Sequence, residues 1–220
     1  HQSISTPLIG LGQPGLTSFE PAFADEVAAI MDWSFGHMQD DENGGSVYLR
    51  LSTRQLDQPT RTLDEKTKSD IVRGGYWLVP PTQGTKKIIV YTGAIAPEAL
   101  KAFDEVKARR PDIGLLSVTS TDRLYNEWQD LERARLSGKD AGKSAHVEDL
   151  LKPLAGDARI VTVIDGHPAA LAWLGGVRGH AVAPLGINSF GQCGDLIDLF
   201  DHYQISDHWI TKATERFDRK

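Results

Sequence analysis

Short apolar runs alternate with amphipathic stretches along the chain from about residue 84 to its end. The apolar runs predict strands at 87–91, 114–118, 159–164 and 181–185. The stretches between and after them predict helices at 97–109, 121–136, 147–151, 168–174, 195–203 and 207–217. Strands that alternate with helices favour a mainly parallel sheet with helices on both faces. We therefore predict an α/β fold for this part of the chain.

The first part of the chain has a different pattern. Residues 1–18 are rich in Gly, Pro, Ser and Thr and are predicted to form a loop. A helix is predicted to begin at Glu20 or Pro21, because proline suits the first helical position and acidic residues crowd the first turns. Residues 46–52 alternate between polar and apolar and predict a strand.

A polar stretch then separates the two parts. Residues 53–63 contain a proline and are predicted to be a connector. Residues 64–73 predict a short helix that Gly74 stops, and residues 76–79 are expected to be extended. We therefore expect an N-terminal part, a linker and a C-terminal part, at residues 1–54, 55–83 and 84–220.

Composition narrows the class of protein. With 220 residues, 40% of them hydrophobic and 25% charged, the chain has the composition of a globular protein with a sizeable core. A net charge of −6 argues against a nucleic-acid binder, which usually carries a basic face. No apolar stretch has the length of a membrane span, and no charged-then-apolar leader opens the chain. The single cysteine, Cys193, fits a reducing compartment, so we expect a cytoplasmic location.

The sequence lacks the common catalytic and nucleotide-binding motifs that a short, self-contained enzyme would carry. The chain has no G-x-x-x-x-G-K-[ST] loop, no G-x-G-x-x-G after a predicted strand, no G-x-S-x-G and no H-E-x-x-H. A self-contained nucleotide-binding enzyme or serine hydrolase is therefore less expected. The seven histidines are scattered, and four of them have no partner at metal-ligand spacing, so we predict no metal site: His146, His180, His202 and His208.

His167 lies where a site could form. It follows Asp165 at a predicted strand end and precedes Pro168, which begins a helical turn. An ionisable ring is thereby placed at the edge of the sheet where ligands bind in open α/β folds. Two interpretations stay open. His167 takes part in such a site, or it only contacts Asp165 and braces the turn. We favour the second.

Other candidate residues have simpler interpretations. Residues 189–194 could bind an anion where the next helix begins, but an ordinary capped helix, with Asp195 supplying the charge, is favoured. No general base stands beside Cys193 in the sequence, so a nucleophilic role is not expected. Phe19 and Phe23 open a helix, and such rings matter for function only if a flat cofactor ring lies against them.

Four segments carry a family resemblance: residues 15–27, 91–99, 161–168 and 184–192. They resemble the C-terminal part of the thiamine-diphosphate-dependent first component of pyruvate dehydrogenase complexes, in the single-chain, homodimeric, transketolase-like class. The resemblance implies that the N-terminal part is the end of the pyrimidine-binding domain. The C-terminal part would be the transketolase C-terminal domain. Because the resemblance is to the C-terminal part of such enzymes, it implies that this chain is a piece of a longer enzyme.

The resemblance also implies cofactors, site residues and partners. The complete enzyme would use thiamine diphosphate and Mg²⁺, held by groups ahead of His1, so this chain alone is not expected to bind them. His1 and His167 would be catalytic residues at the active-site mouth, and Phe19 and Phe23 would contact the cofactor. The implied partners are the missing N-terminal domains, a second copy in a homodimer and the lipoyl-bearing acyltransferase component. Neither a nucleic acid nor a membrane is expected as a partner.

The expected function is therefore that of a fragment. The complete enzyme would decarboxylate pyruvate or 2-oxobutyrate and pass the acyl group to lipoyl, and this part would serve dimer assembly and the active-site entrance. The isolated chain is expected to be inactive. Two alternatives remain: a ketol transferase such as transketolase or deoxyxylulose-phosphate synthase, and a non-catalytic assembly domain.

Overall fold

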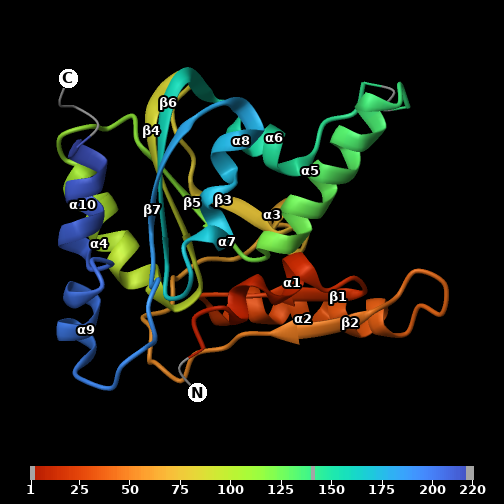
Figure 1. The fold of residues 1–220 in the computed structure, drawn as a ribbon, viewed down its shortest axis with the longest axis horizontal. Helices are drawn as coiled ribbons and strands as arrows, with labels where there is room; N and C mark the ends of the chain where they lie inside the picture. Colours follow the sequence, from red (N-terminus) through yellow and green to blue (C-terminus); the bar gives the residue numbers. More distant parts are fainter. Residues whose placement is uncertain (1–2, 140–141, 217–220) are drawn as a thin grey trace.

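A five-stranded sheet forms the centre of the molecule (Figure 1). The structure, a computed structural model, describes residues 3–139 and 142–216. The strand order is β3-β5-β4-β6-β7, with four parallel strands and an antiparallel edge strand, β3. The strands are β3 (Gly75–Val79), β4 (Thr85–Thr92), β5 (Gly114–Val118), β6 (Leu154–Ile164) and β7 (Ala181–Leu185). The predicted α/β fold with a mainly parallel sheet is confirmed.

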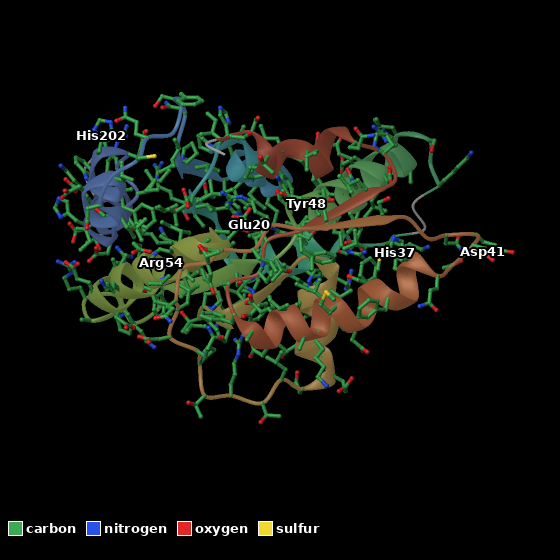
Figure 2. The ribbon with its side chains drawn as sticks, turned by 90° about the horizontal axis from the view of Figure 1, so that it is seen from below. Glu20, His37, Asp41, Tyr48, Arg54 and His202 are labelled. Atoms are coloured by element: carbon green, nitrogen blue, oxygen red, sulfur yellow. The ribbon has the colours of Figure 1, made fainter. Side chains whose placement is uncertain are left out.

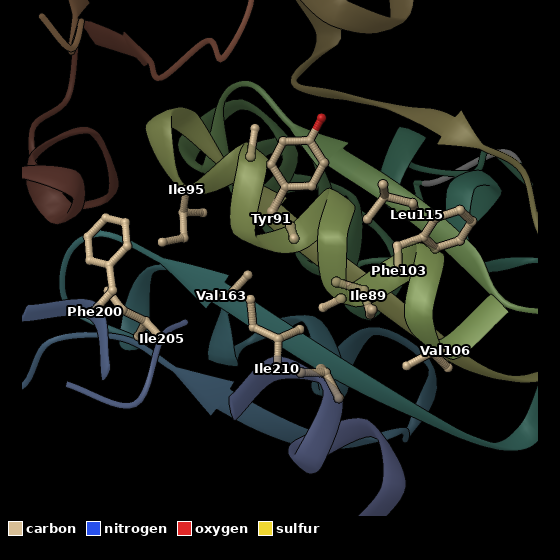
Figure 3. Packing of buried hydrophobic residues seen from close by; sticks show 14 of the residues in the cluster. Ile89, Tyr91, Ile95, Phe103, Val106, Leu115, Val163, Phe200, Ile205 and Ile210 are labelled. Carbon is tan, nitrogen blue, oxygen red and sulfur yellow. The ribbon is translucent and has the colours of Figure 1, made fainter. Parts of the chain in front are cut away.

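Helices cover both faces of this sheet because successive side chains of a strand point to opposite faces. In β4, Ile89 and Tyr91 face one apolar cluster, whereas Ile88 and Val90 face the other. Helices α4 (Ala96–Lys107), α9 (Leu196–His202) and α10 (Asp207–Arg216) cover the first face (Figures 1 and 3). The second face is covered by α5 (Thr121–Leu136), α6 (His146–Leu151), α7 (Ala169–Ala172) and α8 (Leu174–Arg178).

The N-terminal part forms a second, smaller sheet below the first in Figure 1. Its two strands run parallel and pair in register from Leu16 opposite Ser46 to Phe19 opposite Leu49. The elements here are η1 (Thr6–Leu8), α1 (Ile9–Gly12), β1 (Leu16–Phe19), α2 (Ala24–Met38) and β2 (Ser46–Leu49). Parallel strands need a crossover connection, and α2 provides it.

Three predictions for this part need correction. Residues 6–19 hold η1, α1 and β1, where we expected a loop up to residue 18. β1 forms because its backbone pairs with β2, a long-range contact that its Gly- and Ser-rich surroundings conceal. Helix α2 begins at Ala24 and not at Glu20 or Pro21, because the Glu26 carboxylate accepts hydrogen bonds from the N–H groups just ahead of the helix. β2 ends at Leu49, three residues earlier than expected.

The predicted linker contains ordered structure. Helix α3 (Glu65–Arg73) ends at Gly74, whose left-handed conformation (φ 112°) confirms the predicted stop. β3, which we placed in the linker, is an edge strand of the five-stranded sheet, with Tyr76 opposite Ser117. The short helix η2 (Gly93–Ile95) then joins β4 to α4. Among the described residues, no helix combines the length and apolar character that crossing a bilayer requires.

Candidate functional site

The carboxyl ends of four strands meet between the two sheets. The residues that follow β1, β2, β4 and β6 are Glu20, Arg50, Gly93 and Asp165. Arg50 is the centre of this group, because Nη1 donates to the Glu20 carboxylate and Nη2 donates to the Asp165 carbonyl oxygen at 2.7 Å. Figure 2 shows Glu20 deep in the middle of the molecule. One guanidinium thus joins the small sheet to the large one.

A second ion pair lies beside the first. Arg54 donates to both carboxylate oxygens of Glu98, at 2.9 and 2.8 Å, and to the carbonyl oxygen of Ala94 at 3.2 Å. Its guanidinium lies over the Phe200 ring, 5.4 Å from the centroid. Such a paired, planar contact fixes the side chain more firmly than a single hydrogen bond would. We name the five side chains the strand-end cluster: Glu20, Arg50, Arg54, Glu98 and Asp165.

Burial controls the protonation of the strand-end cluster. Burial raises the pKa of the Glu20 carboxyl to about 7, although the neighbouring Arg50 opposes this rise. Burial also raises the pKa of Asp165, against the attraction of Arg50 and Arg54. A carboxyl group with a pKa near neutrality can both hold and release a proton at physiological pH. Glu20 is therefore the described residue of this cluster best suited to acid–base chemistry.

The space next to Glu20 is small. A cavity of about 20 Å³ lies among hydroxyl-bearing side chains that include Ser18, Tyr48, Thr92 and Thr121. This volume suits about one water molecule and is too small for a substrate. The cluster could bind or transfer a proton here, but a substrate would need space formed outside the described residues.

The pKa of Glu20 makes a prediction about stability. An unfolded glutamate titrates near its ordinary value of 4.5, whereas folded Glu20 titrates near 7. Between these values the folded state binds more protons, so stability falls as pH rises through this window and levels off above it. Glu20→Gln should remove up to about 3 kcal/mol of this decline. Urea unfolding at pH 5 and pH 8 measures it, and an unchanged decline in the variant would contradict the assignment.

Gly93 lies against the Glu20 side chain. It has a φ of +66°, and an added Cβ would lie 2.5 Å from Glu20 Oε1. Gly93→Ala is therefore expected to lower the free energy of unfolding by about 2–3 kcal/mol. Gly84→Ala is the matched control, because Gly84 has a φ of +80° and nothing lies within 4 Å of the place its Cβ would take. Denaturant unfolding of both variants checks this, and equal losses would show that the contact with Glu20 has no effect.

The structure places His167 beside the cluster, where its hydrogen bonds are made with the backbone. Its backbone N–H donates to the Ile4 carbonyl oxygen at 2.9 Å, and Nδ1 accepts from the N–H of Ala169 at 3.2 Å. These contacts are of the kind that the bracing interpretation expects, with Ala169 as the partner where we expected Asp165, and a part for His167 in a site stays a prediction. His1, the other predicted catalytic residue, lies outside the described residues.

Phe19 and Phe23 are packed into the protein interior. Phe19 is 1% exposed and meets the Trp33 ring edge-on, with centroids 5.5 Å apart. Phe23 is 2% exposed, and the Arg61 guanidinium lies 5.4 Å from its ring centroid. Neither ring has a free face for a cofactor in this chain, because neighbouring side chains already cover both. Phe19 and Phe23, as they are packed here, therefore do not fit the thiamine ring.

The predicted anion site and the histidines remain to be placed in the structure. Asp195 caps α9 by accepting a hydrogen bond from the N–H of Ile197 at 2.9 Å, which favours the ordinary helix start over an anion site. His37 and His202 lie at opposite ends of the molecule (Figure 2). Over residues 3–139 and 142–216, no three His, Cys, Asp or Glu side chains gather as a metal site requires.

The strand-end cluster was not identified from the sequence. A signal was present, because Glu20, Arg50 and Asp165 each stand first after a strand. The carboxyl ends of parallel strands are where polar groups gather in open sheets. Using that signal requires knowing that β1 and β2 are parallel strands, which their sequences alone do not show.

Comparison with curated proteins places the chain near one group of enzymes. No family model matches it. The pyruvate dehydrogenase E1 component of Cupriavidus necator is 22% identical over 205 residues, which cover 91% of this chain and 22% of that protein. The E1 component of Mycolicibacterium smegmatis is 29% identical over 163 residues, 71% of this chain and 17% of that protein. The chain thus spans about a fifth of the length of these relatives.

Solved structures of transketolases are similar in fold to this chain. Transketolase from Leishmania mexicana superposes with a TM-score of 0.71 at 15% identity, over 98% of this chain and 27% of that chain. A Pichia stipitis transketolase complex with sedoheptulose 7-phosphate gives 0.68 at 19% identity, over 98% of this chain and 27% of that one. A split-gene transketolase, described as an inactive β4 tetramer, gives 0.62 at 20% identity, over 98% and 61%. The chain therefore has the fold of a transketolase segment and is similar in sequence to pyruvate dehydrogenase E1 components.

Proposed function

We propose that this chain is the C-terminal part of a thiamine-diphosphate-dependent 2-oxo acid dehydrogenase that acts on pyruvate or 2-oxobutyrate. The observation that carries the proposal is the alignment of 91% of the chain with only 22% of an E1 component. In the complete enzyme the bound cofactor supplies an electron sink for decarboxylation. This chain would serve dimer assembly, and residues near the strand-end cluster would form a wall of the active-site entrance.

The small sheet supports this role. Within the described residues, β1 and β2 form a parallel sheet of two strands. Sheets usually have more strands, about four to six. We infer that further strands from preceding domains extend it, so that residues 1–54 complete the pyrimidine-binding domain. Residues 84–220, together with β3, would be the transketolase C-terminal domain.

The isolated chain is expected to bind neither thiamine diphosphate nor Mg²⁺. Its aromatic rings at Phe19 and Phe23 are covered, and the groups that hold the diphosphate are proposed to lie in other domains. Calorimetry with thiamine diphosphate and Mg²⁺ at millimolar concentration should give no heat of binding. Tight, Mg²⁺-dependent binding would overturn the domain assignment.

The catalytic proposal is tested on the complete gene product. It is supplied with thiamine diphosphate, Mg²⁺ and a dye acceptor, and pyruvate, 2-oxobutyrate and xylulose 5-phosphate are compared. Dye reduction with a 2-oxo acid supports the dehydrogenase and ranks the substrates. Ketol transfer from the sugar phosphate alone would replace it with a transketolase-like enzyme.

A non-catalytic assembly role is the second candidate. The likeness to a split-gene transketolase chain that forms an inactive tetramer favours it, because that chain assembles without activity. The complete gene product would then show no turnover with any of the three substrates. Of these candidate functions, only the dehydrogenase requires a lipoyl-bearing acyltransferase as a partner. Co-sedimentation with such a component would therefore favour the dehydrogenase over the assembly role.

A further inference from the structure

A groove lies between the last helix and the last strand of the sheet, and no residue of the strand-end cluster lines it. Helix α10 buries Ile210 and Thr214 on its inner side. Its residues Trp209, Lys212 and Ala213 share a different side, because their spacing brings them together on a helix. They line the groove with β7 residues and with Arg216, one turn further along. α10 and β7 lie side by side in Figure 1.

The size of this groove suits a small molecule. Its volume is about 550 Å³, within the range of small-ligand clefts, roughly 300–1,000 Å³. Ala183 and Leu185 of β7 and Ala213 of α10 provide apolar surface. The Trp209 indole is held in place, because Nε1 donates to the Asp201 carboxylate at 2.9 Å. We name this feature the β7–α10 groove.

An added peptide strand is a poor occupant. Among the described strands β7 pairs only with β6, so its other edge is open. Pro184 lies in the middle of β7, opposite Thr162. Proline is tolerated in a ladder only where its nitrogen faces away from the paired strand. The open edge of β7 therefore lacks a donor at its centre, which blunts it against strand addition.

The charge of the groove points to an anion. Lys212 and Arg216 form no ion pair with any described residue, and the Lys212 ammonium lies 4.3 Å from the Trp209 ring centroid. Glu215 also lines the groove, and its carboxylate forms an ion pair with Arg109 at 2.8 Å. Within the part of the chain that the structure describes, two cations without acidic partners thus stand beside apolar surface, in a chain with a net charge of −6. Their complement is an organic anion with an apolar body.

We propose that the β7–α10 groove binds a small organic anion. Its carboxylate or phosphate lies between Lys212 and Arg216, and its apolar body rests on Ala183, Leu185 and Trp209. The proposal is independent of the function proposed for the whole protein, because it uses no residue of the strand-end cluster. It assigns a ligand site to a surface that no part of the proposed function requires.

The probe is 2-naphthoate, with uncharged 2-naphthamide as the matched control compound. Binding is followed by NMR, through the indole N–H signals of the five tryptophans. The signal that disappears in Trp209→Phe is assigned to Trp209. We expect the Trp209 signal to shift and saturate with a dissociation constant on the order of 1 mM, as a ligand of this size allows. 2-Naphthyl phosphate, run in parallel, distinguishes a phosphate site from a carboxylate site by which anion binds more tightly.

The variant Lys212→Gln/Arg216→Gln should weaken 2-naphthoate binding at least about tenfold, since two ionic contacts are lost. Lys68→Gln changes an exposed lysine on α3 and should leave binding unchanged. The other four indole signals show that each variant is folded. Equal binding of 2-naphthamide, an unaffected double variant, or no shift at Trp209 would each overturn the proposal.

Discussion

Glu26→Ala is expected to lower the free energy of unfolding by about 3–5 kcal/mol, the largest of the stability losses that we predict. The Glu26 side chain is fully buried and accepts hydrogen bonds from the N–H of Ala22 at 2.6 Å and of Phe23 at 3.0 Å. It also accepts from the hydroxyls of Tyr76 at 2.6 Å and Ser117 at 3.3 Å. Removing the carboxylate would leave these donors buried and unpaired and would open a cavity.

Denaturant unfolding measures this loss, and two further variants interpret it. Glu42→Ala removes an exposed glutamate and should change stability by less than about 0.5 kcal/mol. Glu26→Gln keeps the shape of the side chain but places an NH2 group against hydrogen-bond donors. Its loss of unfolding free energy should therefore lie between those of Glu26→Ala and Glu42→Ala. A loss below about 1 kcal/mol for Glu26→Ala would show that water replaces the carboxylate.

Arg50→Met is expected to lower stability by about 3 kcal/mol at pH 8, because it leaves Glu20 buried without its cation. The Asp165 carbonyl oxygen would also lose its donor. The loss should be smaller at pH 5, where Glu20, whose pKa burial raises to about 7, is protonated in the folded state. Unfolding curves at the two pH values test this difference.

A double-mutant cycle isolates the Glu20–Arg50 pair. When Glu20→Gln is already present, Arg50→Met should cost clearly less at pH 8, since no buried charge is left behind. Arg50→Lys keeps the charge but has one nitrogen for two acceptors, so a partial loss is expected. Additive losses in the cycle would mean that Arg50 acts through Asp165 alone.

The sequence predicted the central strands of the large sheet well because burial on both faces makes them continuous apolar runs, as in β5, whose residues are all buried. The predicted strands at 114–118 and 181–185 coincide with β5 and β7, and the predicted helix at 121–136 coincides with α5. β1 was missed because its four residues form a strand only through pairing with β2, about 30 positions away. The local sequence pattern of a short strand does not indicate which distant strand it pairs with.

The candidate site was harder to predict than the fold. We chose His167 for its chemistry and its place at a strand end, and the structure puts it next to the strand-end cluster. The residues that make the cluster come from 20, 50, 54, 98 and 165, so no spacing motif joins them. Their role comes from burial and mutual contact, which are properties of the folded chain.

The contacts between the two sheets have a consequence for how the chain comes apart. Arg50 at the end of β2 and Glu26 on α2 are among the residues that fasten the N-terminal part to the large sheet, and β3 continues from α3 directly into that sheet. A nick in the exposed stretch between β2 and α3 would therefore leave both pieces attached to each other. The boundary that composition marks along the sequence separates two sheets but not two cooperative units, and the protein should melt as one.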